Sequence, residues 1–340
     1  MALISCKNES AVDKTNPFFS EFNTPFNIPP FEKIMARHYM PAFEKGMADA
    51  RKELQQLIAN KEEPTFENTI EALDKTGELL ASVNRVFYAQ ANSNTNDSLQ
   101  AIEVEISPKL AAFNDEIRLN PELFSRIKSV YDNQAKFNLN PEQQYILENL
   151  YREFVRNGAN LNREDQDALR KINQELSVLT VRYSQNVLDE TNNYRLVVDE
   201  KDLAGLPEAV IAVAADAAKE SGNEGKWVFT TQRPSIFPFI TYSPSRELRK
   251  TIYNAYINRG NNGNESDNNQ LMSDIVRLRA ERAKLLGYKT HSHIVLEPRM
   301  AKAPENVLSL LDNLWEKAVP VAKNEVKEMQ KIIEKEGDNF

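Results

Sequence analysis

The chain has 340 residues, and its 42 Lys and Arg against 50 Asp and Glu give a net charge of −8, which makes a nucleic-acid partner a poor expectation. With 41% hydrophobic residues, the sequence has enough apolar material for a folded core. The single Cys excludes an internal disulfide framework and a cysteine-based zinc site, and three His severely limit metal chemistry with histidine ligands.

Residues 1–15 resemble a truncated lipoprotein signal followed by a linker. Leu3-Ile4-Ser5-Cys6 matches a lipobox, but the basic segment and most of the apolar stretch of a signal peptide are missing. The alternative is an ordinary frayed terminus with a free thiol. No stretch approaches the ~18 apolar residues of a membrane span, so lipidated Cys6 would be the only link to a membrane. A lipidated protein would face the periplasm from a bacterial envelope, whereas an unlipidated one would be cytoplasmic.

Residues 16–190 predict an N-terminal helical region. An extended, proline-rich lead-in should come first, because each proline disfavours helix at the residue before it. Apolar residues at helical spacing then begin at Phe31 and continue to Leu57. We expect a second helix from Pro64 to Phe87 and a third over 99–117.

Two later helix starts in this region have clear local signals. Asn120-Pro121 and Asn140-Pro141 each place a capping Asn before a proline that suits the first turn. Gly158 should end the second of these helices. Another apolar stripe follows over 169–187.

Residues 191–243 predict a small β element, with short strands near 194–198 and 226–231. A short helix over 207–220, closed by Gly222, should lie between them. The segment 234–242 contains two prolines and several aromatics, and we expect it to be extended and to pack against a helix.

Residues 244–340 return to helical patterns, with helices expected over 244–258 and 270–286 and a Gly/Asn-rich loop over 259–269. A short helix should open near His291, and the last helix should begin at Pro304. The predicted fold class is therefore mainly α, with long antiparallel helices and one small β element.

Few residues stand out as catalytic or metal-binding candidates. His38 sits among apolar neighbours, and His291 and His293 would not share a helix face. The sequence contains no His-Glu-x-x-His, no G-x-S-x-G and no Walker-type glycine loop. We assign no catalytic and no metal residue in this chain.

The stretch after the second strand is the most informative part of the sequence. Arg246 and Arg249 lie three residues apart, with Tyr253, Tyr256 and Arg259 further along the same helical pattern. We favour a structural interpretation, in which the arginines tie helix ends to acidic partners and the tyrosines pack with satisfied hydroxyls.

These residues resemble the thimet oligopeptidase/oligopeptidase A family, and most closely its bacterial peptidyl-dipeptidase (dipeptidyl carboxypeptidase) branch. The resemblance covers nearly the whole chain. It starts at Asn16-Pro17-Phe18 and Pro29-Pro30-Phe31, continues through Pro64 to Ile70, and is strongest from Pro238 to Gly260. It then runs through Asp267-Asn268-Asn269, Ile275 to Tyr288, Arg299-Met300-Ala301 and Pro304 to Val307.

The resemblance implies a zinc metallopeptidase that removes C-terminal dipeptides from short unfolded peptides in a deep channel between two helical lobes. In that family two His of His-Glu-x-x-His and a downstream Glu hold one zinc, and the motif Glu is the general base. No position here matches those residues. We therefore expect the chain to be an N-terminal portion that supplies one wall and the lid of the channel. It should bind no zinc and should be inactive without the C-terminal catalytic half. The alternative is a stand-alone helical peptide-binding or scaffold protein without catalysis.

Overall fold

The computed structural model describes residues 15–337, so Cys6 and its lipobox lie outside the described residues. The described residues form two compact units, which divide between Val276 and Arg277. The described part is mainly helical with one two-stranded sheet, which confirms the predicted fold class. The four-part division made from the sequence stays a prediction.

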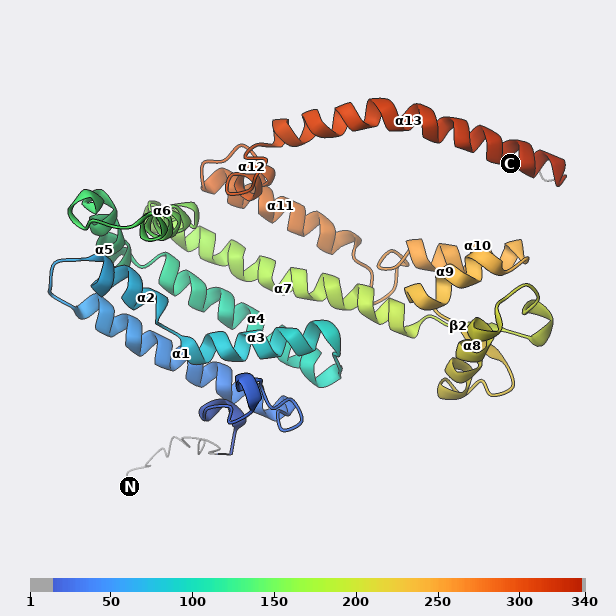
Figure 1. Ribbon diagram of the computed structural model, residues 1–340, viewed down its shortest axis with the longest axis horizontal. Coiled ribbons are helices and arrows are strands. Elements are labelled where there is room, and N and C mark those ends of the chain that lie inside the picture. Colours follow the sequence, from blue (N-terminus) through green and yellow to red (C-terminus); the bar gives the residue numbers. More distant parts are fainter. Residues whose placement is uncertain (1–14, 338–340) are drawn as a thin grey trace, which may run out of the picture. The chain divides into compact units, whose positions relative to one another are not determined.

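Long helices build the first unit, and they pack pairwise (Figure 1). α1 lies against α3, and α4 lies against α7. The main helices of this unit are α1 (Ala36–Ala59), α3 (Glu78–Ser93), α4 (Asp97–Arg118), α5 (Pro121–Asp132), α6 (Pro141–Arg156) and α7 (Arg163–Asn193).

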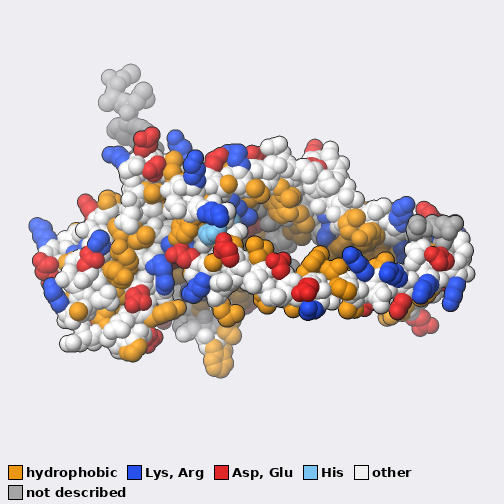
Figure 2. All heavy atoms as spheres, turned by 90° about the horizontal axis from the view of Figure 1, so that it is seen from above, with side chains coloured by type: hydrophobic (Ala, Val, Ile, Leu, Met, Phe, Trp, Pro, Cys, Tyr) orange, Lys and Arg blue, Asp and Glu red, His pale blue; other side chains and the backbone are white. Residues whose placement is uncertain are grey.

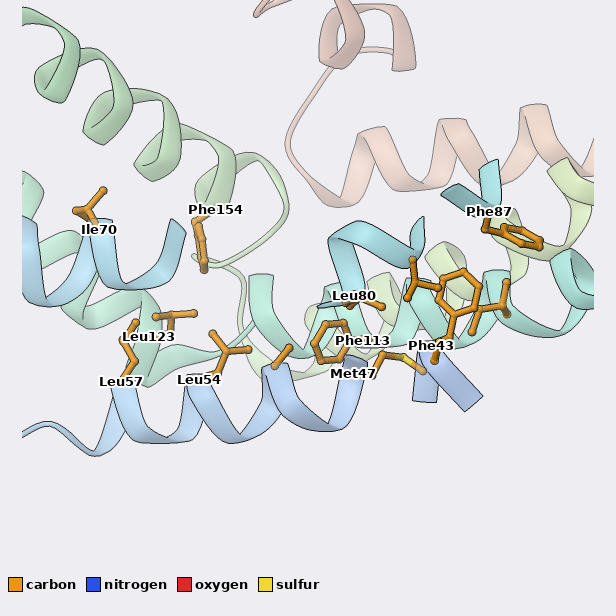
Figure 3. Close-up of a cluster of buried hydrophobic side chains, with 14 of the residues drawn as sticks. Phe43, Met47, Leu54, Leu57, Ile70, Leu80, Phe87, Phe113, Leu123 and Phe154 are labelled. Atoms are coloured by element: carbon orange, nitrogen blue, oxygen red, sulfur yellow. The ribbon is translucent and has the colours of Figure 1, made fainter. Parts of the chain in front are cut away.

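The main core fills the space between these helices. Phe43, Met47, Leu54 and Leu57 follow one another at helical spacing on α1, so they share the buried face. Side chains from the neighbouring helices meet them there (Figure 3). Gly46 lies on this face, and a Cβ added there would come within 2.9 Å of the Leu80 Cα on α3. The close approach of the two helices therefore depends on a glycine at this position.

The predicted caps are confirmed. The side chains of Asn120 and Asn140 accept hydrogen bonds from the main-chain N–H groups of Leu123 and Gln143, at 2.9 Å each. Gly158 has a φ of +94° two residues beyond the end of α6, the left-handed conformation that glycine adopts readily.

Two expectations for the N-terminal helices were wrong. The helix expected from Pro64 to Phe87 is broken into η3 (Phe66–Glu71), the single turn α2 (Ala72–Asp74) and α3. Gly77 causes the break because its φ of +75° lies outside the right-handed helical region. Phe31 is also not yet helical: it lies in a turn, and α1 begins only at Ala36.

The small β element has the predicted position. β1 (Leu196–Val198) pairs antiparallel with β2 (Trp227–Phe229), and Leu196 lies opposite Phe229. α8 (Glu208–Glu220) lies between the strands in sequence and packs on β2. A second hydrophobic cluster holds these elements together with the two helices that follow.

The segment expected to be extended is instead a helix, α9 (Arg233–Tyr242). Pro234 occupies its first turn, where a missing N–H costs no helical hydrogen bond. The aromatic Phe239 is fully buried beside Phe229, with ring centroids 4.4 Å apart. Tertiary packing thus favours the helix despite the internal Pro238.

The remaining helices are α10 (Arg246–Ile257), α11 (Asn269–Leu285), α12 (His291–Leu296) and α13 (Pro304–Lys335). The loop between α10 and α11 lies where the sequence predicts it. Among residues 15–337, no helix combines the length and the apolar composition needed to cross a membrane.

Candidate functional site

The motif residues of the sequence lie on α10 and around its two ends. Arg249 Nη1 donates to the carbonyl of Ser243, at 2.6 Å. Ser243 is the residue that ends α9, so Arg249 joins the end of one helix to the body of the next. We expected an acidic partner for this arginine, and its bond instead goes to a main-chain carbonyl. Arg246 and Tyr253 lie on the exposed surface of α10, with Tyr253 50% exposed.

Arg259 connects the end of α10 to α7. Its Nε donates to the carbonyl of Tyr256 at 2.9 Å, and its Nη1 donates to Thr191 Oγ1 at 3.1 Å. The guanidinium carbon also lies 4.1 Å from the centroid of the Tyr256 ring, a cation–π arrangement. Tyr256 is therefore covered on one face by Arg259. The structure brings these two motif residues together.

Glu190, near the end of α7, holds the loop that follows. Its carboxylate accepts hydrogen bonds from the Gly260 N–H at 2.5 Å, Asn262 Nδ2 at 2.8 Å and Asn264 Nδ2 at 2.6 Å. We call this set of three bonds the Glu190 clasp. It fixes residues 260–264 to a helix that lies about 70 positions earlier in the sequence.

Asn268 holds the other end of the loop. Its Oδ1 accepts from Asn186 Nδ2 at 2.9 Å, and its Nδ2 donates to the carbonyl of Tyr183 at 3.0 Å. Its own N–H donates to the carbonyl of Gly260 at 2.7 Å. Gly260 has a φ of +75°, and a Cβ there would lie 2.9 Å from Asn268 Nδ2. Both ends of the loop thus bind the last turns of α7.

The hydrogen bonds of the clasp and of its loop lower the pKa values of two carboxyl groups, those of Glu190 and Asp267. Burial raises the pKa of the Glu190 carboxyl, but the three hydrogen bonds outweigh burial and leave this pKa below its ordinary value. Asp267 opposes them through its negative charge. The pKa of Asp267 is itself lowered, because its carboxylate accepts from the main-chain N–H groups of Asn269 and Gly263. Both carboxylates are therefore held as anions by donors of the loop.

The sequence analysis did not identify Glu190 or Asn186, and it named Asn268 only as part of the family resemblance. It recognised the Gly/Asn composition of 259–269, but an acidic residue near the end of a helical stripe is common and gives no specific signal. Only the excess of asparagines could have indicated that the loop is held by side-chain amides.

The three histidines occupy separate structural positions. His38 is buried, and its Nδ1 accepts from the Met35 N–H at 3.1 Å at the start of α1. His293 Nδ1 lies 2.8 Å from Thr290 Oγ1. The pKa of His291 is lowered by burial and then by the nearby Arg279 and Arg282. Within residues 15–337, no three His, Cys, Asp or Glu side chains gather to hold a metal ion, so these residues do not fit a zinc site.

Comparison with known proteins identifies the relatives of this chain. Residues 239–340, which include α10 and the clasped loop, match peptidase family M3. The chain is 33% identical over 326 residues to dipeptidyl carboxypeptidase of Escherichia coli K12. The aligned region makes up 96% of this chain and 48% of that protein. The chain is 31% identical over 328 residues to oligopeptidase A of the same organism, with 95% and 47% covered.

The resemblance predicted from the sequence is therefore confirmed: the chain is homologous to M3 peptidases over nearly its whole length. It spans about half the length of the curated relatives it matches.

Proposed function

We propose that this chain, as a homologue of the M3 peptidases, is the N-terminal portion of a zinc-dependent peptidyl-dipeptidase. In this proposal it supplies one wall and the lid of a channel that admits short unfolded peptides. One observation carries the proposal. The match to a dipeptidyl carboxypeptidase extends over 96% of this chain but over only 48% of that relative.

The chemistry would come from residues outside this chain. The 340 residues contain no His-Glu-x-x-His, and the described part gathers no metal-binding group. A bound zinc would supply an activated water for attack on the peptide carbonyl. What this chain contributes is a rigid helical framework, in which α9, α10 and the clasped loop are fixed to α7.

In this proposal α13 supplies the surface that binds the catalytic half. This helix has 32 residues, and none of those described is buried. Its apolar residues recur every three or four positions, so they form one continuous face. They include Leu308, Leu311, Leu314, Trp315, Val326, Met329 and Ile332, each more than half exposed. In Figure 2 hydrophobic side chains lie between charged ones on the surface seen from above. Exposed apolar faces of this length are typical of surfaces that bind another protein surface.

The experiment is a peptidase assay with the purified 340-residue chain, zinc and a short blocked peptide. We expect no release of C-terminal dipeptide from the chain alone. We expect release once the chain is made as one polypeptide with the segment encoded directly downstream in the same reading frame. Zinc-dependent dipeptide release by the chain alone would overturn the claim that it is inactive.

A second arm tests the alternative of a stand-alone protein. A stop codon directly after the codon for Phe340, together with a monomeric product that melts cooperatively, would favour a scaffold without catalysis. A downstream reading frame that continues to a His-Glu-x-x-His favours the peptidase.

A further inference from the structure

We propose that Asn262 is a deamidation site that the Glu190 clasp protects, and that its conversion to aspartate releases the loop 259–269 from α7. The proposal concerns the chemistry of the chain itself and goes beyond the proposed peptidase function. It starts from the sequence Asn262-Gly263, because a glycine after asparagine leaves the main-chain nitrogen unhindered by a side chain.

The reaction needs only water from the solvent. The Gly263 main-chain nitrogen loses its proton and attacks the Asn262 Cγ, so that a new C–N bond closes a five-membered succinimide ring. The bond from Cγ to Nδ2 breaks, and the nitrogen leaves as ammonia. Water then opens the ring at one of its two carbonyls and gives aspartate or isoaspartate at this position.

The structure restrains both reacting groups. Asn262 Nδ2 donates to Glu190 at 2.8 Å and to the carbonyl of Asn258 at 3.0 Å, so the side chain must break two bonds before it can turn. The Gly263 N–H donates to Asp267 Oδ2 at 2.9 Å. A carboxylate next to this N–H disfavours the amide anion that has to form. Both residues are exposed, so water has access as soon as these bonds open.

Conversion of Asn262 to aspartate would replace the hydrogen bond to Glu190 with repulsion between two carboxylates. The amide donates to Glu190, whereas a carboxylate in its place can only accept. Two anionic groups would then face each other at hydrogen-bond distance, and Asp267 adds a third negative charge to the same loop. We expect the loop to leave Glu190.

The chain contains an internal comparison at Asn157-Gly158. This second Asn-Gly pair lies at the end of α6, where Asn157 Nδ2 donates to the carbonyl of Glu153 and the Gly158 N–H donates to that of Val155. The Asn157-Gly158 pair is held by main-chain carbonyls at the end of a helix, and Glu190 does not contact it. Removal of Glu190 should therefore affect Asn262 alone.

The first experiment measures deamidation by peptide mass spectrometry after incubation of the full chain in mildly alkaline buffer. We compare the wild type with Glu190→Gln, which keeps one acceptor oxygen, and with Glu190→Ala. We expect Asn262 to react about tenfold faster in the alanine variant, equivalent to about 1.4 kcal/mol of protection, with the glutamine variant in between. Asn157 should be unchanged, and chain unfolded in urea should react fastest at both sites. Equal rates at Asn262 in all three folded proteins would overturn the proposal.

The second experiment tests the release of the loop by limited trypsin digestion. Asn262→Asp mimics the product, and we expect faster cleavage after Arg259, since this residue is held against Thr191 and Tyr256 in the clasped state. Asn261→Asp is the matched control, because Asn261 uses its side-chain oxygen to accept from Asn269 Nδ2 and aspartate keeps that oxygen. If the two variants are cut at the same rate as the wild type, the loop is not released and the proposal fails.

Discussion

At the scale of single residues, Arg126 on α5 connects three segments through one buried guanidinium. It is only 8% exposed, and all four of its recorded bonds go to uncharged oxygens. Nη1 donates to the carbonyls of Asn60 and Glu62, and Nη2 donates to Asn68 Oδ1 and Thr69 Oγ1. The turn after α1 and the start of η3 are therefore fixed to α5 by one side chain.

We expect Arg126→Met to lower the free energy of unfolding by about 2–4 kcal/mol, because it leaves several acceptors without a donor. Arg126→Lys should recover only part of the loss, since an ammonium cannot reproduce the fork of donors. Urea unfolding measures both. Arg85→Met, at an exposed position of α3, is the control and should change stability by less than about 0.5 kcal/mol. A loss of the same small size at Arg126 would contradict this role.

Glu190 gives a second prediction at this scale, through pH. Its pKa in the folded chain is lowered, so its contribution to stability is present above the unfolded value of about 4.3 and is lost as pH falls through the folded value. We expect the stability difference between the wild type and Glu190→Gln to be largest near neutral pH and to shrink in acid. Urea unfolding over a pH series measures it. The charged group that acts on Glu190 is Asp267, which raises the Glu190 pKa and whose own pKa is lowered by hydrogen bonds from the loop.

Glu265→Gln is the control for this pH series, because it removes one charge from the same loop without touching the clasp. A stability difference for Glu190→Gln that stays constant from neutral pH into acid would show that the carboxylate charge is not what holds the loop.

At the scale of elements, Gly46 sets the distance between α1 and α3. In an exposed helix, Gly→Ala stabilises by about 1 kcal/mol. Here the added Cβ would lie 2.9 Å from the Leu80 Cα and 3.0 Å from the Leu80 main-chain nitrogen. Because these atoms belong to the backbone, the strain can be relieved only if the helices move apart.

We therefore expect Gly46→Ala to destabilise the chain by about 1–3 kcal/mol, the usual cost of overpacking. Leu80→Ala should not rescue it, since the clash is with the main chain rather than with the side chain. Thermal and urea unfolding of the two single variants and the double variant give the free energies of unfolding for a double-mutant cycle. Rescue in the double variant would mean that the Leu80 side chain, and not the backbone, determines the spacing.

The elements also show which parts of the fold are readable from sequence. The caps at Asn120 and Asn140 and the turn at Gly158 were predicted because each depends on residues within four positions. α9 was missed because its helical state depends on burying Phe239 against β2. The Glu190 clasp was missed because it joins positions about 70 residues apart. Local chemistry determines helix ends, whereas contacts distant in sequence fix the loop.

At the scale of the whole molecule, the apolar face of α13 determines how the purified chain should behave. α13 has 32 residues and none of its described side chains is buried, so packing within its own unit adds little to its stability. It should either bind another surface or associate with itself. We expect the isolated chain to bind an apolar dye and to self-associate as its concentration rises.

The double variant Leu311→Glu with Leu314→Glu tests this expectation. It places two charges in the middle of the apolar face, so dye binding and self-association should fall. The melting temperature should stay within a few degrees, because both side chains are already more than half exposed and their replacement costs little packing. Light scattering and dye fluorescence measure the change. Asn313→Glu with Asn324→Glu adds the same charge on the opposite, polar side of the helix and should leave association unchanged. Equal effects of the two double variants would show that net charge governs association, and the assignment of α13 as the contact surface for a catalytic half would lose its support.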